Sequence, residues 1–415
     1  MSLATCGHMV RALWIVAALG CGGGGASHSD AAIPGDAPPD AVTRSYRLAA
    51  TGTQVDPATG AYLGDTNLAD DVDVIAIHQD FYGVPWTAFE NHTAPPAAWV
   101  ATMQTLVQHA AGHDVFLSLT PLDGDRQQLA PDVNADGTLA RGWSPTCYDL
   151  GTAADGPALR AAYTAYVTYM VNLFHPRWVN VAIEVNLFHV YCPAQWAGMV
   201  ELEQAAYAAA KTAAPDVPAF PSIQINALDG DAYATEYAAL SGLTRDRFAI
   251  SAYPYAVPYA TPADIPPDWL TRAAAQGGER LFIAETGWLG TDLVAIDPSG
   301  ACSTILSDPP QDQADYLDLL VATAKANDVE VITWFSDRDA VDAPMMTDCP
   351  CTYSQPWCAL VAYFRAQGGS DPTAQFAQEL GLKTFGTLGI RDYTGTPRLP
   401  VYSHWQAARA ATLEP

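Results

Sequence analysis

Two glutamates stand where short apolar segments of the chain end. Glu184 ends the segment 178–184, and Glu285 ends the segment 281–285. Both segments have the length and composition of buried parallel strands, so each carboxylate is expected at a strand end. Carboxylates that two strand ends deliver to one cleft can hydrolyse a glycosidic bond. One of them must be protonated as the acid, and the other must be ionised as the nucleophile.

Other residues at the expected strand ends could bind a sugar. Tyr253 could donate a hydrogen bond to an ionised nucleophile, and Trp288 and Trp334 offer flat apolar faces for a pyranose ring. The alternative for these aromatic residues is ordinary core packing. The alternative for the glutamates is a structural ion pair with an arginine.

Three polar residues end another apolar segment. His78, Asp80 and Tyr82 are expected to line the same cleft. A histidine at such a position is also often a core residue whose hydrogen bonds are satisfied.

Eight apolar segments of strand length follow residue 44. They do not alternate polar and apolar residues, so both faces are expected to be buried, as in a parallel sheet. They span residues 45–50, 72–78, 114–120, 178–184, 220–226, 248–253, 281–285 and 329–335. Alanine-rich stretches with helical spacing separate most of them, at residues 96–111, 157–174, 194–214 and 311–327. This alternation predicts an α/β fold, a single (β/α)8 barrel domain over residues 44–415. No clear helix follows the first segment.

Long loops follow several of the expected strands, at residues 121–152, 296–310 and 336–385, the last with a helix-like piece at 357–367. In this fold the loops after the strands build the active face. Six cysteines lie in or near these loops: Cys147, Cys192, Cys302, Cys349, Cys351 and Cys358. An even number favours disulfides in an exported chain, and no histidine lies at zinc-ligand spacing. We expect Cys147 to pair with Cys192, and Cys302 with a cysteine near 350, so that disulfides stiffen the rim.

The N-terminal segment has the pattern of an export signal. Arg11 precedes a short apolar stretch that ends in Ala18-Leu19-Gly20-Cys21, which resembles a bacterial lipobox with Ala18 in the place usually held by leucine. We expect residues 1–21 to be a lipoprotein signal, with ordinary secretion as the alternative. Residues 22–43 have the composition of a flexible tether. The protein is therefore expected at the cell surface or secreted, with membrane contact only through a lipid anchor.

The charge and the motifs exclude several partners. A formal charge of −26 repels nucleic acid and anionic lipid. The stretch 132–137 (DVNADG) matches the first half of a calcium loop, but Trp143 stands where the closing glutamate is needed. We expect no required cofactor; a calcium ion completed by other residues is the alternative to a polar turn.

Four segments carry a resemblance to a known group of enzymes: 248–254 (FAISAYP), 283–288 (IAETGW), 331–335 (VITWF) and 389–398 (GIRDYTGTPR). In this order they resemble retaining glycoside hydrolases of clan A, most of all the family 53 endo-galactanases. The resemblance implies that Glu184, on the fourth strand, is the acid/base and that Glu285, on the seventh, is the nucleophile. It also implies that Tyr253 hydrogen-bonds the nucleophile and that Trp334 forms the floor of the sugar site.

One position departs from the clan. Most members carry an asparagine directly before the acid/base glutamate, where it binds the sugar 2-hydroxyl, and this chain has Ile183. Asn186 could reach the sugar instead, provided that the strand continues past Glu184. Because of this departure, the sequence specifies the acid/base role of Glu184 and the substrate less fully.

The sequence therefore predicts a monomeric retaining glycoside hydrolase that cleaves a β-linked polysaccharide or oligosaccharide by double displacement, with endo action. A non-catalytic carbohydrate-binding surface lipoprotein on the same barrel is the first alternative, which Ile183 makes reasonable. A structural surface protein without a sugar site is the second. The sequence leaves the identity of the sugar and its linkage open.

Overall fold

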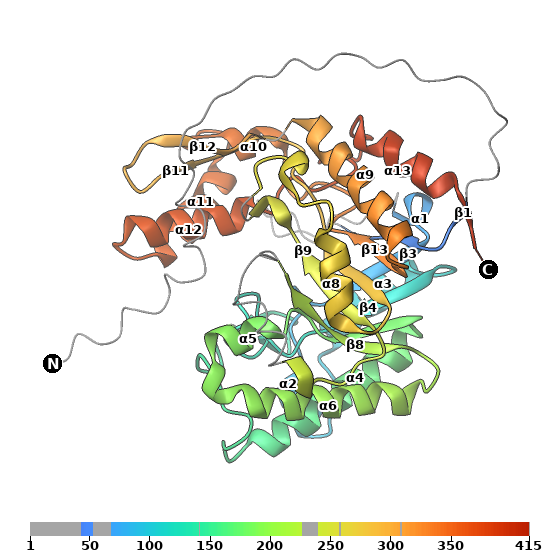
Figure 1. Ribbon diagram of the computed structural model, residues 1–415. Helices are drawn as coiled ribbons and strands as arrows, with labels where there is room; N and C mark the ends of the chain where they lie inside the picture. Colours follow the sequence, from blue (N-terminus) through green and yellow to red (C-terminus); the bar gives the residue numbers. More distant parts are fainter. Residues whose placement is uncertain are drawn as a thin grey trace.

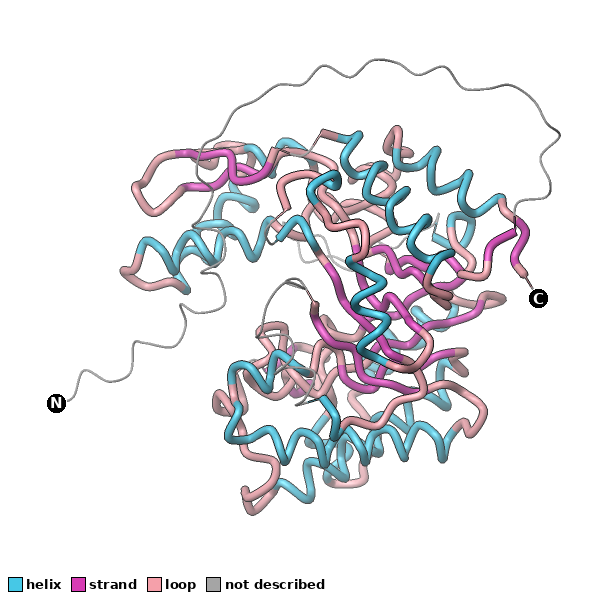
Figure 2. The backbone as a smooth tube through the Cα atoms, viewed as in Figure 1, coloured by secondary structure: helices cyan, strands magenta, loops and turns pink. Residues whose placement is uncertain are grey.

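The computed structural model describes residues 43–52, 68–140, 142–225, 240–256, 259–307 and 309–414. Its centre is a closed barrel of parallel strands in the order β10-β13-β2-β3-β4-β7-β8-β9 (Figures 1 and 2). These are β2 (Arg47–Thr51), β3 (Val74–His78), β4 (Asp114–Ser118), β7 (Trp178–Ala182), β8 (Ala219–Gln224), β9 (Phe248–Ala252), β10 (Leu281–Thr286) and β13 (Val331–Trp334). The predicted (β/α)8 fold is confirmed, and each of the eight predicted segments contributes one strand.

Helices cover the outside of the barrel (Figure 1). They are α1 (Leu68–Asp71), α3 (Ala97–His109), α4 (Gly156–Phe174), α6 (Trp196–Ala213), α8 (Trp269–Gly277), α9 (Pro310–Ala326) and α13 (Val401–Ala410). The alanine-rich stretches predict α3, α4, α6 and α9. Between the first two barrel strands, the described residues contain only the short helix α1, in line with the weak sequence signal there.

Shorter elements lie in the loops and at the ends of the chain. They are α2 (Trp86–Glu90), α5 (Asn186–Tyr191), η2 (Pro193–Gln195), η3 (Leu240–Gly242), η4 (Pro254–Ala256), η5 (Pro262–Asp264), the hairpin of β5 (Asp132–Val133) and β6 (Leu139–Ala140), and the pair of β1 (Thr43–Arg44) and β14 (Thr412–Leu413). The β1–β14 pair is parallel and joins the two ends of the described chain.

A small subdomain stands on the barrel, at the upper left of Figure 1. It consists of the antiparallel pair β11 (Leu293–Ile296) and β12 (Cys302–Leu306) with α10 (Ala343–Thr347), α11 (Gln355–Gln367) and α12 (Pro372–Lys383). Its sequence is the loop after β10 together with the loop after β13, so it rises from the carboxyl ends of the strands. Buried Lys383 donates to Glu379 at 3.1 Å and to the Val294 carbonyl at 2.6 Å, which ties α12 to β11.

The barrel interior has an apolar part and a polar part. The apolar part is a cluster of ten inward-facing residues: Ala49, Val74, Ala76, Phe116, Trp178, Phe220, Ala249, Phe282, Ala284 and Val331. The next inward positions toward the carboxyl ends are polar and buried: Thr51, His78, Ser118, Asn180, Ser222, Ser251, Glu285 and Thr333. The polar end of the barrel is therefore the end at which both glutamates lie.

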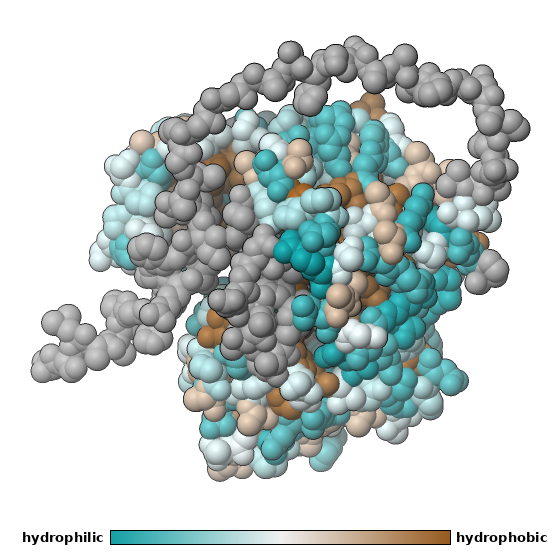
Figure 3. Space-filling view, viewed as in Figure 1, coloured by the Kyte–Doolittle hydropathy of each residue, from teal (hydrophilic) through white to brown (hydrophobic). Residues whose placement is uncertain are grey.

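The expected signal peptide, and the tether up to residue 42, lie outside the described residues. Within the part of the chain that the structure describes, no helix has both the length and the apolar character that a membrane crossing requires. Hydrophilic and neutral residues make up most of the face shown in Figure 3, with hydrophobic residues in small separate groups.

Candidate active site

Glu285 reaches the barrel mouth through a β-bulge. The pairing of β10 with β9 shifts by one residue between Ile283 and Glu285, so that Glu285 lies opposite inward-facing Ser251. A bulge of this kind changes the face to which the next side chain points. The Glu285 side chain, 6% exposed, accepts a hydrogen bond from the Tyr253 hydroxyl at 3.0 Å and contacts His78 Nε2 at 2.9 Å. The contact with Tyr253 is the one that the sequence predicts.

His78 and Tyr253 hold the two oxygens of Glu285 from opposite sides. Burial lowers the pKa of His78, but the adjacent Glu285 carboxylate more than offsets this, and the pKa lies above its usual value. Burial, and then the charge of Glu285, raises the pKa of Tyr253 well above 10.0, so its hydroxyl remains a donor. Each neighbour contacts one oxygen of Glu285, so the two together fix the orientation of its carboxyl group.

Glu184 lies two residues beyond the end of β7 and has a left-handed backbone, with a φ of 48°. Its N–H donates to the Ser222 hydroxyl at 3.0 Å, which anchors the turn to β8. The side chain is 12% exposed, and its Oε2 contacts Arg126 at 3.1 Å. Burial raises the pKa of Glu184 to about 7; Arg126 opposes this rise, and the charges of Glu285 and Asp80 add to it.

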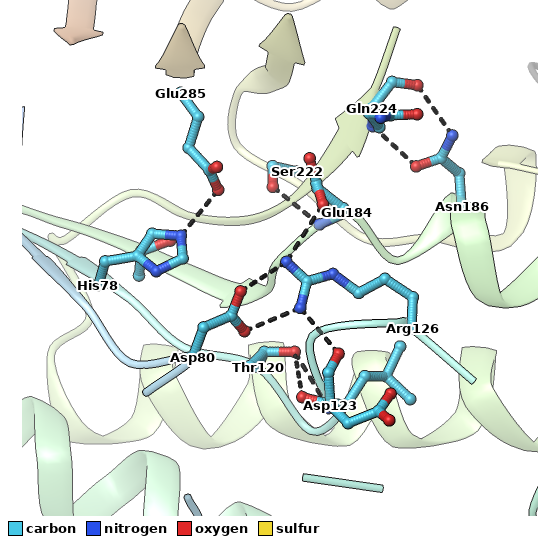
Figure 4. A network of polar contacts seen from close by, with 12 residues as sticks. His78, Asp80, Thr120, Asp123, Arg126, Glu184, Asn186, Ser222, Gln224 and Glu285 are labelled. Atoms are coloured by element: carbon cyan, nitrogen blue, oxygen red, sulfur yellow. Dashed lines mark hydrogen bonds and ion pairs between the residues drawn. The ribbon is translucent and has the colours of Figure 1, made fainter. Parts of the chain in front are cut away.

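Arg126 is the charged residue that the sequence reasoning missed. It lies in the loop after β4, is buried, and donates to both oxygens of Asp80 at 2.8 and 2.7 Å while also contacting Glu184 (Figure 4). Burial lowers the pKa of Arg126, but Asp80 and Glu184 raise it above its ordinary value, so the guanidinium is a permanent charge. The only sequence signal was an arginine in a long loop on the active face, which gives no distance to either carboxylate.

The Arg126 loop is fixed by several contacts. The Arg126 N–H donates to the Asp123 carbonyl at 3.0 Å, and the Cys147 N–H donates to the Gln127 carbonyl at 2.7 Å. Cys147 forms a disulfide with Cys192, which follows α5. The loop that carries Arg126 is therefore joined to the segment that follows Glu184.

Asn180 supports the site from inside the barrel. Its amide donates to the Ser118 and Ser222 hydroxyls at 3.1 and 2.9 Å, and its carbonyl oxygen accepts from the Ala182 and Ser222 N–H groups at 3.1 Å each. Ser222 is the residue whose hydroxyl accepts from Glu184 N–H. This satisfied polar network fixes the turn that carries Glu184.

The predictions for the two tryptophans are wrong. Trp334 and Trp288 are both 0% exposed, so neither offers a face to a sugar. Along β13, Val331 points inward, and strand alternation directs Trp334 outward, where its Nε1 donates to the Leu388 carbonyl at 2.6 Å. Trp288 packs against Tyr316, with ring centroids 5.2 Å apart.

Phe335 has the position that the sequence reasoning gave to Trp334. It is next on the inward face and partly exposed, and its ring centroid lies 5.3 Å from that of His78 and 6.4 Å from that of Tyr253. Phe385, which follows α12 and is 41% exposed, packs edge-on against Tyr253 at 5.1 Å. These two phenylalanines are the aromatic surface beside Glu285, and an exposed phenylalanine after a helix gave no sequence signal.

Two other predicted sugar ligands have different positions. Asn186 begins α5, and its amide pairs with both main-chain groups of Gln224, at 3.0 and 2.8 Å. Figure 4 shows it directed toward Gln224, so the prediction that it replaces the missing asparagine is wrong, because the strand ends before it. Tyr82 accepts from Trp99 Nε1 at its carbonyl and lines a neighbouring pocket. Ile183, in the place of the clan asparagine, is fully buried.

The stretch 132–137 contains β5 and the turn of the β5–β6 hairpin. Asp136 accepts from the Thr138 N–H and hydroxyl at 3.0 and 2.6 Å, and Asp132 contacts Thr87. Among the described residues, one group of metal-binding side chains is close enough to hold an ion: Asp348, Cys351 and Cys358. Its two cysteines form a disulfide, so both sulfurs are already bonded.

The disulfides confirm both pairings that the sequence predicts. Cys147 pairs with Cys192, and Cys302 pairs with Cys349, which leaves Cys351 with Cys358. All three lie in the loops after the strands or beside them. The Cys302–Cys349 bond joins the two loops that build the subdomain.

Comparisons with known proteins support the fold. No family model matches the chain, and no curated protein matches its sequence. Among solved structures, an exo-β-1,4-mannosidase from Opitutaceae bacterium strain TAV5 is similar, with a TM-score of 0.55, 14% identity, and coverage of 89% of this chain and 60% of the other. Xylanase 10C from Cellvibrio japonicus has a TM-score of 0.52, 10% identity and coverage of 90% and 72%. The GH53 catalytic domain from Ignisphaera aggregans has a TM-score of 0.50, 15% identity and coverage of 88% and 96%. The barrel fold of clan A glycoside hydrolases is therefore shared over nearly the whole described chain.

Proposed function

We propose that the protein is a retaining glycoside hydrolase that cleaves a β-linked glycan with Glu285 as nucleophile and Glu184 as acid/base. One observation carries the proposal: two glutamates, one after β7 and one on β10, lie at the polar end of the barrel with different partners. Glu285 accepts a hydrogen bond from Tyr253 and contacts His78, so its carboxyl group is held by polar partners on both oxygens. Burial raises the pKa of Glu184 to about 7, so its protonated form is favoured below about pH 7.

In the first step, Glu285 attacks the anomeric carbon as the glycosidic C–O bond breaks. Glu184 gives its proton to the departing oxygen, and a covalent glycosyl-enzyme forms. Tyr253 and His78 keep the Glu285 carboxylate in one orientation, which limits the motion needed to reach the transition state.

In the second step, the ionised Glu184 takes a proton from water while that water attacks the anomeric carbon and displaces Glu285. A group that acts first as an acid and then as a base works best when its pKa is near the working pH. The pKa of about 7 for Glu184 meets this requirement.

Arg126 has a positioning role in this proposal. It orients Glu184 through the contact at 3.1 Å and is itself fixed by Asp80. Asp80 takes up part of the arginine charge, which otherwise would hold Glu184 ionised. The three side chains together place the acid and set its pKa.

The substrate is proposed to be a neutral β-linked polysaccharide cleaved internally. The net charge of −26 disfavours anionic glycans, and Phe335 and Phe385 offer apolar surface beside Glu285. Two similar structures are named for an exo-β-1,4-mannosidase and a xylanase, which supports a β-linked substrate, whereas the proposal of internal cleavage does not come from them. The three disulfides suit export to an oxidising compartment, where we propose that lipidated Cys21 anchors the protein.

A glycan panel tests the proposal. Purified protein is incubated with galactan, mannan, xylan and β-glucan, and new reducing ends are measured, with Glu285→Gln as the inactive control. On an activated aryl glycoside, Glu184→Ala should regain turnover with azide, which needs no base, and should release a β-glycosyl azide. Wild-type activity of Glu184→Ala on polysaccharide would exclude Glu184 as the acid/base.

A second function is supported by Ile183. A buried isoleucine stands where most of the clan binds the sugar 2-hydroxyl, and a barrel without that contact could bind glycans without cleaving them. Calorimetric binding of an oligosaccharide that the wild type leaves intact would favour this carbohydrate-binding function.

A further inference from the structure

A pocket that includes Phe81 in its lining lies near His78, the residue that contacts Glu285. It encloses about 220 Å³ between the loop after β3, the first turns of α3 and the β5–β6 hairpin. Its lining includes Phe81, Tyr82, Trp99, Thr102, Asp136 and Gly137. Neither proposed catalytic step uses this pocket.

The pocket combines flat apolar surface with polar groups. Phe81 is 46% exposed, an unusual position for a large aromatic side chain, and supplies the apolar surface, whereas Trp99 is 3% exposed and only backs the wall. Trp99 is held in place, because its Nε1 donates to the Tyr82 carbonyl at 3.0 Å. The Thr102 hydroxyl and the Asp136 carboxylate supply polar atoms. Sugars have apolar CH faces and hydroxyl edges, so this mixture suits a sugar unit better than it suits a wholly apolar ligand.

The wall on the hairpin side is preformed. Gly137 has a φ of 86°, and a Cβ at this position would lie 2.8 Å from the Ala98 side chain, so the hairpin turn packs directly on α3. The Asp136 carboxylate accepts from the Thr138 hydroxyl and N–H, which lowers its pKa and keeps it ionised. A fixed wall reduces the ordering cost of binding. The turn that resembles half of a calcium loop thus shapes this pocket.

Phe81 links the pocket to the catalytic centre by packing, because it lines the pocket and its ring lies near that of His78. The ring centroids of Phe81 and His78 are 6.2 Å apart, and His78 contacts Glu285 at 2.9 Å. At about 220 Å³ the pocket is smaller than the roughly 300–1,000 Å³ typical of sites for drug-sized ligands, which fits a single sugar unit of a longer chain. The ionised Asp136 disfavours a uronate there.

We propose that this pocket is a distal subsite that holds one neutral sugar unit of a glycan whose reacting unit lies at Glu184 and Glu285. The inference rests on the proposed function and adds a substrate requirement. The enzyme should prefer neutral chains long enough to reach from the glutamates past Phe81.

The test compares variants that alter the pocket with a matched control. Thr102→Tyr fills the pocket from α3, and Phe81→Ala removes the aromatic surface. Thr105→Tyr adds the same side chain one turn further along α3, at an exposed position outside the lining. The probes are galacto-, manno-, xylo- and cello-oligosaccharides from disaccharide to hexasaccharide, with aryl monoglycosides of the same sugars.

The readout is the ratio of kcat/KM for the hexasaccharide to kcat/KM for the aryl monoglycoside. We expect this ratio to fall about tenfold in Thr102→Tyr and Phe81→Ala, which corresponds to the loss of one sugar contact, and to stay unchanged in Thr105→Tyr. An unchanged ratio in both pocket variants would overturn the subsite. An equal loss on both substrates would also overturn it, because Phe81 would then act at the catalytic centre.

Two further outcomes distinguish a failure of the subsite proposal from a failure of the proposed hydrolysis. If the wild type cleaves none of the probes, hexasaccharide binding by calorimetry decides: weaker binding by Thr102→Tyr than by Thr105→Tyr supports the subsite although hydrolysis has failed. If no probe binds, both proposals are overturned. Oligogalacturonides should neither bind nor be cleaved, and their use as substrates would contradict the preference for neutral sugars.

Discussion

The contacts of Arg126 predict that the pKa of Glu184 shifts in opposite directions when Arg126 or its partner Asp80 is replaced. In the wild type, Arg126 lowers the pKa of Glu184, whereas the charge of Asp80 raises it, around a value of about 7. Arg126→Met removes the lowering charge. Asp80→Asn removes the raising charge and also frees Arg126 to act on Glu184 alone. The pKa of Glu184 should therefore rise in the first variant and fall in the second.

The magnitude follows from the geometry. A pair of unit charges about 4 Å apart interacts by roughly 4 kcal/mol at an effective dielectric constant of about 20, which corresponds to about three pKa units at most. The guanidinium is shared with Asp80 through two contacts of 2.8 and 2.7 Å, so only part of its charge acts on Glu184. We expect a rise of about one to two units in Arg126→Met and a fall of about one unit in Asp80→Asn.

The assay is the pH profile of kcat/KM, which reports the ionisation of the free enzyme. Glu184 must be protonated to assist the leaving group, so the rate falls as pH rises through its pKa. The alkaline limb should move to higher pH in Arg126→Met and to lower pH in Asp80→Asn. If the alkaline limbs of the two variants shift in the same direction, or if neither limb moves in variants that remain active, Glu184 is not the acid whose pKa Arg126 and Asp80 control.

A control separates the electrostatic effect from damage to the fold. Removing one partner of a buried ion pair typically costs about 3–5 kcal/mol of stability, so both variants are checked by thermal unfolding before assay. Arg126→Lys keeps the positive charge but loses the two-pronged contact with Asp80, and its alkaline limb should stay nearest to that of the wild type.

The remaining predictions concern Glu285, the outer helices and the loops. Tyr253→Phe removes a hydrogen bond to the charged Glu285 and should lower kcat/KM by about 10- to 100-fold without preventing folding; an unchanged rate would contradict the contact at 3.0 Å. Burial raises the pKa of Glu203 from its ordinary value of 4.5 to about 8, so its contribution to stability is full below about 4.5 and is lost as pH rises toward and through 8. Glu203→Gln should flatten this decline in Tm between pH 5 and 8, and a parallel decline would disprove it. Titration of unfolded, unreduced protein should find the six cysteines of the three disulfides oxidised, and free thiols from them would contradict the pairing.

The barrel was predictable because its strands are buried on both faces and separated by alanine-rich helices. That pattern depends on local composition alone. The position of Glu285 at a strand end was also predictable, but its inward direction depends on the bulge at Ala284, which leaves no mark in the sequence. The contact from Tyr253 was predicted from its place at a strand end and from the resemblance.

The errors at Trp334 and Asn186 have a common cause. Each assignment depended on the direction of a side chain at the end of a strand, and one residue of register reverses that direction. Phe335, not Trp334, continues the inward face of β13, and the chain turns into α5 before Asn186. Arg126 was missed because its partners Asp80 and Glu184 meet it only through the folded loop.

The central claim is that Glu285 forms a covalent bond to the sugar, and covalent trapping tests it most directly. The protein is incubated with activated 2-deoxy-2-fluoro glycosides of the sugars that the glycan panel identifies. The fluorine slows both steps, and the activated leaving group restores the rate of the first step alone, so the glycosyl-enzyme accumulates. Intact-mass spectrometry should show the addition of one fluoroglycosyl group, and peptide mapping should locate it on Glu285. Labelling of a different residue, or rapid turnover of an activated substrate without any labelled intermediate, would contradict the account.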